Sequence, residues 1–256
     1  MKRREFITLL GGAAAWPHGA RGQEPKKIPR LCFLTFDPGT AQSPSPRFEA
    51  FFQGLRDLGY VNGETLTIDY VSAEGRTDQY PALAAECVRN NPDIIAVTTT
   101  PGALALKKAT KTIPIVMVAL GDPVGTGIVD SLARPGGNIT GMSHMTSELA
   151  AKLLQLLKEA VAGISRVLAL AYLADPISPL YVQALKEAAP SLGVTLQIRD
   201  VRTADGLPSA FDTGAGEGAE GLITNSESIF RAERACDRTR GSLQIACYLS
   251  LCGFRR

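Results

Sequence analysis

Three consecutive threonines at the end of a short apolar segment are well suited to bind a small anionic group. Thr98, Thr99 and Thr100 are followed directly by Pro101 and Gly102. Proline is favoured in the first turn of a helix, and glycine lets a ligand approach the backbone closely. Threonine hydroxyls and the N–H groups of a helix N-terminus can together hold a carboxylate. The same pattern is equally consistent with a threonine that only caps the helix.

An acidic residue after the next apolar segment offers the opposite charge. Asp122 follows residues 113–120 and precedes Pro123, and its carboxylate can form a charge-assisted pair with an ammonium group. Aspartate before proline also forms turns, so both interpretations stay open. Other polar residues follow further expected strands, and those expected to line the same site are Thr35, Asp37, Tyr172, Asp175 and Asn225.

Motifs of other chemistries are incomplete. Gly125 and Gly127 lack the third glycine of a dinucleotide-binding loop, and residues 214–221 (GAGEGAEG) lack the Lys-Ser/Thr of a phosphate-binding loop. No GxSxG motif supports a hydrolase triad. The chain has two histidines and five cysteines without CxxC spacing, so we expect no metal site and no cofactor. We interpret Cys32 and Cys87 as small buried hydrophobic residues.

The elements that must position these residues alternate along the chain. Continuous apolar segments are typical of buried parallel strands, and the segments between them place apolar residues on one helical face. The expected strands are residues 28–36, 66–71, 94–98, 113–120, 167–172, 195–200 and 221–224. The expected helices are residues 48–58, 78–89, 101–108, 147–161, 180–189 and 207–211. This alternation predicts an α/β fold with parallel sheets covered on both faces.

A glycine-rich stretch divides the alternation into two units. Residues 121–141 read as a linker with one short helical piece, residues 128–132. The helix that follows, residues 147–161, can be capped by Ser147, and its expected buried stripe is Leu149, Leu153, Leu156 and Leu157. Ligands of parallel sheets bind beyond the carboxyl ends of the strands, and two facing units would turn that position into a cleft.

Composition and charge limit the class of protein. The chain has 256 residues, of which 45% are hydrophobic and 20% charged, which is a folding composition. Its formal net charge is +2, whereas a nucleic-acid binder needs a gathered basic excess. We therefore expect no nucleic-acid partner.

The first 22 residues have the pattern of an export signal. Lys2, Arg3 and Arg4 precede a short apolar stretch at residues 6–16, and small residues follow near residues 20–22. The paired arginines also fit a twin-arginine signal, and the Sec and twin-arginine interpretations both stay open. The apolar stretch is too short for a membrane anchor. We expect a periplasmic protein that begins near Gln23.

Long stretches resemble one family, the bacterial ABC-transporter substrate-binding proteins of the tryptophan- and tyrosine-uptake type. The similar stretches are residues 52–88, residues 113–141 (IPIVMVALGDPVGTGIVDSLARPGGNITG) and residues 147–160 (SELAAKLLQLLKEA), and the resemblance reaches about residue 230. It implies a class I-like periplasmic-binding-protein fold whose two lobes close on a small ligand. It also implies delivery to a membrane permease with its ATPase, no catalysis, and amino acids as ligands. An exported ligand-sensing domain and an α/β enzyme with a cleft remain the alternatives.

The last 26 residues do not fit the pattern before them. Residues 231–256 hold three of the five cysteines and six arginines but no lysine, without periodicity. Synonymous codons for residues 236–256, read one base later, can encode a peptide that begins AIALAARYKLPAIYP, which is similar to the next helix and strand of the family. We therefore expect a frameshift after about Phe230. The domains would be residues 1–22, 23–141, an incomplete lobe at 142–230, and an out-of-frame tail. Resequencing of this region tests the frameshift.

Overall fold

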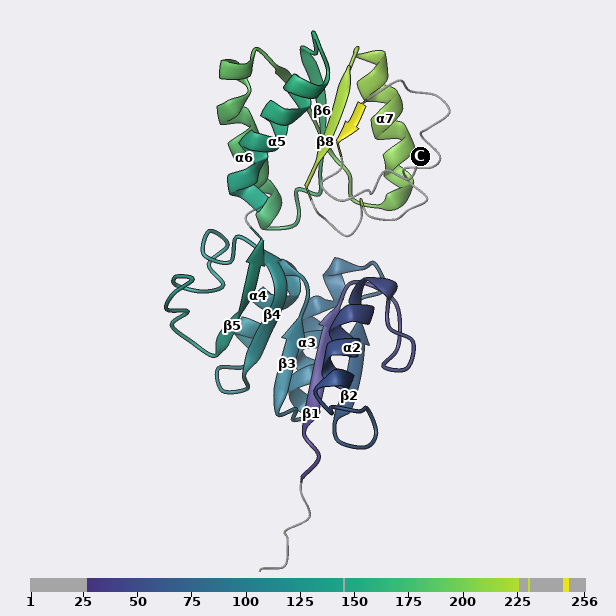
Figure 1. The fold of residues 1–256 in the computed structure, drawn as a ribbon, viewed down its shortest axis with the longest axis vertical. Helices are drawn as coiled ribbons and strands as arrows, with labels where there is room; N and C mark the ends of the chain where they lie inside the picture. The colour runs from purple at the N-terminus through teal and green to yellow at the C-terminus, as the bar shows by residue number, and fades with distance from the viewer. Residues whose placement is uncertain (1–26, 145, 226–229, 231–245, 249–256) are drawn as a thin grey trace, which may run out of the picture.

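The computed structural model describes residues 27–144, 146–225, 230 and 246–248. Within these residues the chain forms two α/β lobes, each built on a parallel sheet (Figure 1). The expected export signal lies outside the described residues, as does most of the tail. Among the described residues, no helix has both the length and the apolar character that a bilayer crossing requires.

The first lobe is a five-stranded parallel sheet in the order β2-β1-β3-β4-β5. Its strands are β1 (Arg30–Thr35), β2 (Thr67–Ser72), β3 (Ile94–Val97), β4 (Ile115–Gly121) and β5 (Ile139–His144). Its helices are η1 (Pro46–Phe48), α2 (Glu49–Asp57), η2 (Thr77–Gln79), α3 (Tyr80–Arg89) and α4 (Thr100–Ala109). Alternate residues of β1 point to opposite faces, which is why both faces of this sheet carry a hydrophobic core. Helices α3 and α4 cover one face, and α2 covers the other with an aromatic cluster around Phe33.

The second lobe repeats the arrangement with a sheet in the order β7-β6-β8-β9. Its strands are β6 (Arg166–Ala171), β7 (Thr195–Asp200), β8 (Gly221–Thr224) and β9 (Ala246–Tyr248). Its helices are α5 (Thr146–Ala160), α6 (Ile177–Ala188), η3 (Pro190–Leu192), η4 (Ala204–Gly206) and α7 (Leu207–Gly216). Helices α5 and α6 pack on one face and α7 on the other, as Figure 1 shows for the upper lobe.

Two expectations about the region between the lobes are wrong. Residues 128–132 form bends instead of a helix, although Ile128 and Val129 are buried in the first core. The supposed linker also ends inside strand β5, because residues 139–141 are the first half of this strand, which pairs in parallel with β4. No apolar run marks β5, because it is an edge strand whose central residues are exposed. At Gly141 an added Cβ would lie 2.2 Å from the Met117 carbonyl oxygen, so this glycine permits the close strand pairing.

Helix α5 is found where the sequence predicts it, but its buried face is rotated. The buried residues are Ala150, Leu154 and Leu157, whereas Leu149 is 49% exposed. Ser147 lies inside the helix, and its hydroxyl donates to the Asp122 carboxylate (3.0 Å). The helical spacing of apolar residues correctly predicts the helix, but it does not predict that Ala150, a small residue, faces the core in place of Leu149.

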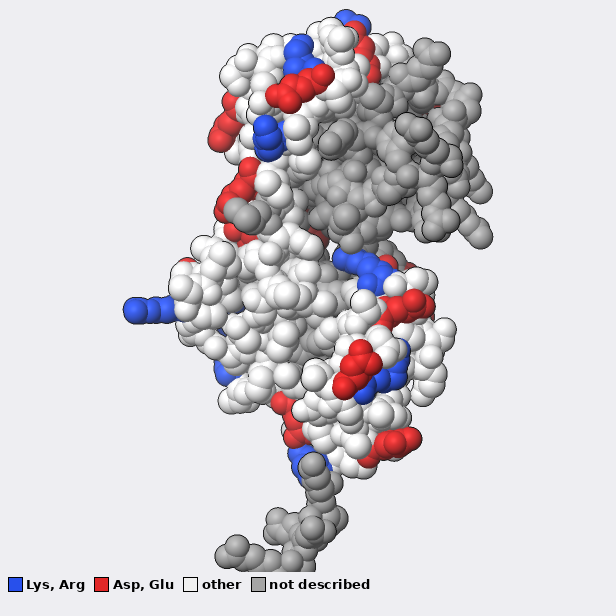
Figure 2. All heavy atoms as spheres, viewed as in Figure 1, with Lys and Arg blue, Asp and Glu red and all other residues white. Residues whose placement is uncertain are grey.

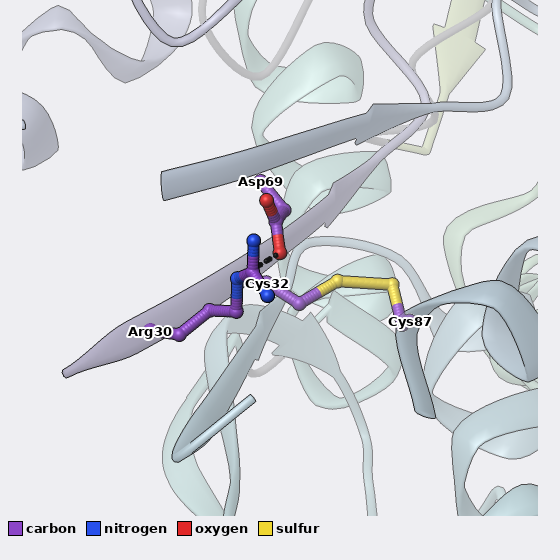
Figure 3. The surroundings of a disulfide bond; sticks show 4 residues. All are labelled: Arg30, Cys32, Asp69 and Cys87. Carbon is purple, nitrogen blue, oxygen red and sulfur yellow. Dashed lines mark ion pairs between the residues drawn. A yellow bond between two sulfur atoms is a disulfide. The ribbon is translucent and has the colours of Figure 1, made fainter. Parts of the chain in front are cut away.

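Cys32 and Cys87 are buried as expected, but they form a disulfide between β1 and α3 (Figure 3). Their Cα atoms are 6.0 Å apart, and 55 positions separate them in the sequence. The interpretation as two unlinked hydrophobic residues was therefore wrong. Such a pairing depends on the packing of α3 against the sheet, which their spacing in the sequence does not indicate.

The frameshift expected for residues 231–256 stays a prediction. Of this tail the structure describes only residues 246–248, which form β9 and pair in parallel with Gly221, Leu222 and Ile223 of β8. The remaining tail residues lie outside the described part of the chain.

Candidate functional site

The expected site residues of the first lobe lie at the carboxyl ends of its parallel strands. Thr35 ends β1, and Thr98 directly follows the neighbouring strand β3. The Thr98 hydroxyl donates to the Thr35 hydroxyl oxygen (3.0 Å), and both side chains are buried. The two residues therefore form one polar unit, as parallel pairing of β1 and β3 requires.

Asp37 joins this unit and carries a charged partner. Its N–H donates to the Thr35 hydroxyl oxygen (3.3 Å), and its carboxylate pairs with Arg47 (3.2 Å). The Asp37 carbonyl oxygen accepts the Ser72 hydroxyl (2.9 Å) and the Tyr70 hydroxyl (3.3 Å) from β2. The loop after β1 is thus held with its half-buried ion pair at the carboxyl edge of the sheet.

The threonine segment forms the N-terminus of α4. Thr99 is the N-cap, and its hydroxyl oxygen accepts the Gly102 N–H (3.3 Å). Thr100 begins the helix and is buried. A Cβ added to Gly102 would lie 2.9 Å from Thr99 Oγ1 and 3.1 Å from Tyr80 Cε1, so the helix start packs tightly. The capping interpretation is observed, and a ligand role for the same end stays a prediction.

Asp122 is engaged at the crossing between the lobes. Its backbone has φ of +34°, and its carboxylate accepts the Gly125 N–H (2.8 Å) and the Ser147 hydroxyl (3.0 Å). Its carbonyl oxygen accepts the Thr126 N–H (3.0 Å) and hydroxyl (2.8 Å). This is the turn-forming alternative, and the expected pairing with an ammonium group would compete with these contacts.

The second-lobe candidates gather at the carboxyl ends of β6 and β8. Asp175 is buried, and its carboxylate oxygen accepts the Ile177 N–H (3.1 Å) at the start of α6. Ser178 donates its N–H to the Asp175 carbonyl oxygen (3.0 Å), and its hydroxyl oxygen accepts the buried Asn225 amide (2.9 Å). Asp175 and Asn225 therefore meet through Ser178, which the sequence interpretation did not single out.

The two carboxyl edges face one another. The hydroxyls of Tyr172, after β6, and of Thr77 in the first lobe are 2.5 Å apart. At the crossing, a Cβ built on Gly121 would lie 3.0 Å from the Ile177 side chain. Contacts between the lobes thus run from the crossing to the polar ends of both sheets, where a ligand of parallel sheets is expected.

Sequence reasoning missed Tyr80, which lies at the same edge. It begins α3 and is 1% exposed, and its hydroxyl has no hydrogen-bond partner among the described residues. Burial raises the pKa of the Tyr80 hydroxyl, and the charges of Asp175 and Asp37 raise it further. The nearby Thr99 hydroxyl and the charge of Arg47 lower it, although the Thr99 contact does not meet the geometry of a hydrogen bond. In the sequence, Tyr80 is only the residue before Pro81 in an amphipathic segment.

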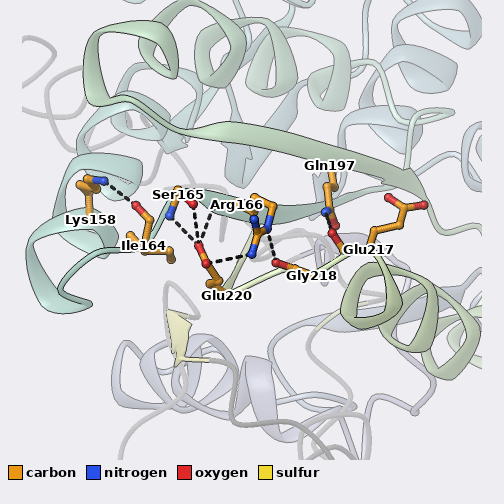
Figure 4. A network of polar contacts seen from close by, with 8 residues as sticks. All are labelled: Lys158, Ile164, Ser165, Arg166, Gln197, Glu217, Gly218 and Glu220. Carbon is orange, nitrogen blue, oxygen red and sulfur yellow. Dashed lines mark hydrogen bonds and ion pairs between the residues drawn. The ribbon is translucent and has the colours of Figure 1, made fainter.

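The amino ends of the second-lobe strands hold a polar network of a different kind (Figure 4). The Glu220 carboxylate accepts the N–H groups of Ser165 (2.6 Å) and Arg166 (3.0 Å) and pairs with the Arg166 guanidinium (3.1 Å). The partners of Glu220 are Ser165 and Arg166 at the start of β6, and Glu220 itself directly precedes β8, so these contacts hold β6 and β8 together. The network does not contribute to the candidate site.

The charges on the molecular surface agree with the small net charge. On the face drawn in Figure 2, acidic and basic side chains are interspersed over both lobes. Among the described residues, no cluster of three or more His, Cys, Asp or Glu side chains is arranged to hold a metal ion.

The family follows from a match over most of the chain. Residues 44–231 match the model of the ABC transporter substrate binding protein family. The chain belongs to this family. Its members are binding proteins rather than enzymes, and they serve ABC transporters as the component that binds a small-molecule ligand. Proteins of this type are typically periplasmic or extracellular.

Relatives and solved structures agree with this assignment. A tyrosine-binding protein of Clostridioides difficile is 30% identical over 169 residues, which are 66% of this chain and 48% of the relative. The ABC domain of Streptococcus pneumonia in complex with L-Trp has a TM-score of 0.67 at 24% identity, over 79% of this chain and 66% of that one. A conserved domain protein of Vibrio cholerae has a TM-score of 0.68 at 28% identity, over 77% and 64%. The chain thus spans about half of its curated relative, and the expected class I periplasmic-binding-protein fold is confirmed.

Proposed function

We propose that this chain is the exported solute-binding component of an ABC importer, and that it holds an amino acid between its two lobes. The family assignment and the similarity to a tyrosine-binding protein support an amino-acid ligand. The observation that carries the proposal is the approach of the two carboxyl edges, marked by the 2.5 Å contact between Thr77 and Tyr172. Polar groups of both lobes can then contact one ligand, and closure around it provides affinity.

The candidate residues divide between the lobes according to the chemistry of a zwitterion. In the first lobe, Thr98, Thr99, Thr100 and Gly102 place hydroxyls and a helix N-terminus where a carboxylate binds well. Asp37 and Asp175 supply negative charge for the ammonium group, and Thr35, Tyr172 and Asn225 supply neutral polar groups beside them. For Asp122, a ligand role requires release of its present contacts.

Calorimetric titration of the purified chain from residue 23 with each of the twenty amino acids tests this proposal. We expect saturable binding of L-tyrosine or another aromatic amino acid. The one tryptophan, Trp16, lies in the expected export signal, so fluorescence of added L-tryptophan, excited where tyrosine does not absorb, can be followed without tryptophan background from the protein. No binding of any amino acid would contradict the proposal.

Delivery to a permease has a separate test. We expect genes for a permease and an ATPase beside the gene for this chain, and the periplasmic fraction of expressing cells should contain the chain without residues 1–22. A neighbouring sensor-kinase gene in place of the transport genes would favour the ligand-sensing alternative.

A further inference from the structure

Two buried tyrosines of this chain differ in what their hydroxyls contact. The Tyr181 hydroxyl donates to the Thr224 carbonyl oxygen (3.1 Å), whereas the Tyr80 hydroxyl has no hydrogen-bond partner among the described residues. Both side chains are at most 1% exposed. A buried hydroxyl without a partner loses its hydrogen bonds to water and gains none in return, and phenylalanine would fill the same space without that loss. Packing alone therefore does not explain the hydroxyl of Tyr80.

The position of Tyr80 points to a ligand. Its ring lies against the N-terminus of α4, because a Cβ added to Gly102 would lie 3.1 Å from Cε1 of Tyr80. Tyr80 directly follows η2, whose Thr77 contacts Tyr172 of the second lobe, so the residue lies near the junction of the lobes. At the start of α4, Pro101 has no N–H and Thr99 accepts the Gly102 N–H, so Thr100 carries the first backbone N–H of the helix that the cap does not take.

We propose that the Tyr80 hydroxyl donates a hydrogen bond to the carboxylate of the bound amino acid, beside the N-terminus of α4. This inference rests on the proposed function, because it assigns one end of the ligand in the same site. Separation of the lobes admits the ligand, and closure places its carboxylate against Tyr80 and Thr99.

The chemistry of the hydroxyl agrees with a donor role. Burial and the charges of Asp175 and Asp37 hold the pKa of Tyr80 above its ordinary value, so the hydroxyl is protonated at neutral pH and can donate a hydrogen bond. An acceptor such as a carboxylate oxygen fits this donor, and the partial positive charge of the α4 N-terminus favours the same group. The negative charges of Asp37 and Asp175 also act at this hydroxyl, so a ligand that carries an ammonium group beside its carboxylate fits better than a dicarboxylate.

The test compares Tyr80→Phe with Tyr181→Phe, two variants that each remove one buried hydroxyl. Calorimetry measures the Kd of each for L-tyrosine and L-tyrosinamide, or for the tightest amino acid of the panel and its amide. We expect Tyr80→Phe to raise the Kd for the acid about tenfold, equivalent to about 1.4 kcal/mol, and to reduce the preference for acid over amide by a similar factor. Without ligand, its Tm should equal or exceed that of the unaltered protein.

The control variant should show the opposite pattern. Tyr181→Phe removes a satisfied hydrogen bond, so it should lower the Tm and leave the Kd for the amino acid within about twofold. An unchanged Kd and an unchanged acid preference in Tyr80→Phe would overturn the inference and leave the proposed function intact. A Tm loss in Tyr80→Phe as large as that in Tyr181→Phe would also overturn it. If the unaltered chain binds no amino acid, the proposed function fails and this inference fails with it.

Discussion

The two lobes hold the amino ends of their sheets in the same way and present different groups at the carboxyl ends. In the first lobe, Asp93 precedes β3, and its carboxylate accepts the N–H of Arg30 at the start of β1 (2.8 Å). In the second lobe, Glu220 precedes β8 and accepts the N–H of Arg166 at the start of β6 (3.0 Å). At the amino ends, one carboxylate thus bridges the first and third strands of each lobe.

The carboxyl ends do not repeat each other in this way. The first lobe places a pair of buried threonine hydroxyls there, Thr35 and Thr98, and the second places the amide of Asn225 on Ser178. The amino ends of the two sheets therefore have the same structural role, whereas the polar groups at the carboxyl ends differ between the lobes. Such a difference is expected where the two lobes contact different parts of one ligand. The lobes also differ in that the first is cross-linked by the disulfide.

Removal of the disulfide should have the largest effect, and it should be confined to the first lobe. Cys32→Ala combined with Cys87→Ala opens a loop of 55 positions, and chain entropy predicts a loss of about 4 kcal/mol in the free energy of unfolding. Hydrogen exchange should accelerate in α3 and β1 and remain unchanged in α5 and α6. Equal acceleration in both lobes would show that they unfold as one unit.

Loss of the contact between the lobes should weaken ligand binding by less. Tyr172→Phe removes the hydroxyl that contacts Thr77, and one hydrogen bond of about 1 kcal/mol corresponds to about fivefold in affinity. Thr77→Val should have the same effect, and the double variant should be no weaker than either single variant. The control is Thr213→Val, because the Thr213 hydroxyl bonds only within α7 among the described residues. If the losses in affinity of the two single variants add in the double variant, the contact between Thr77 and Tyr172 contributes nothing to ligand binding.

Both carboxylates at the amino ends should contribute to the sensitivity of the protein to acid. Backbone N–H groups of Ser165 and Arg166 lower the pKa of Glu220, and Lys27 followed by the Arg30 N–H lowers the pKa of Asp93. A lowered folded-state pKa gives stability that is present above the ordinary, unfolded-state value and is lost as the pH falls through the folded-state value. Glu220→Gln and Asp93→Asn should therefore each reduce the loss of stability on acidification below about pH 5.

Salt should sharpen this last comparison. The Lys27–Asp93 pair is exposed, whereas the main partners of Glu220 are backbone N–H groups. At about 1 M NaCl screening acts over about 3 Å, so the contribution of Asp93 should fall while that of Glu220 remains. Urea unfolding of both variants at about pH 3 and at pH 7, with and without salt, measures the difference. An equal response to salt would contradict the distinction.

Most of the fold could be predicted because apolar strands and amphipathic helices alternate clearly. The expected bounds of two strands, residues 195–200 and 221–224, are those of β7 and β8. Strand β5 could not be predicted in this way, because its exposed Met142 and its glycine break the apolar pattern that identified the other strands. Its position depends on pairing with β4, which is a long-range contact.

The candidate site was predictable in place but less so in detail. Parallel strands end at one edge, so Thr35, Asp37 and Thr98 were correctly expected together. The contacts of Asp122 depend on the path of the chain to Ser147. That the Tyr80 hydroxyl finds no hydrogen-bond partner in the described part of the chain depends on what surrounds it in three dimensions. Neither property leaves a mark on the local sequence.

The turn at Asp122 has a consequence for how tightly the protein retains its ligand. One carboxylate oxygen is held by Gly125 on the first-lobe side and the other by Ser147 at the start of α5. Separation of the lobes must either rotate about this bridge or break it, so the free energy of the open form depends on a residue that need not touch the cargo. A change at Ser147 would then alter the rate of ligand release by loosening the Asp122 carboxylate at the crossing.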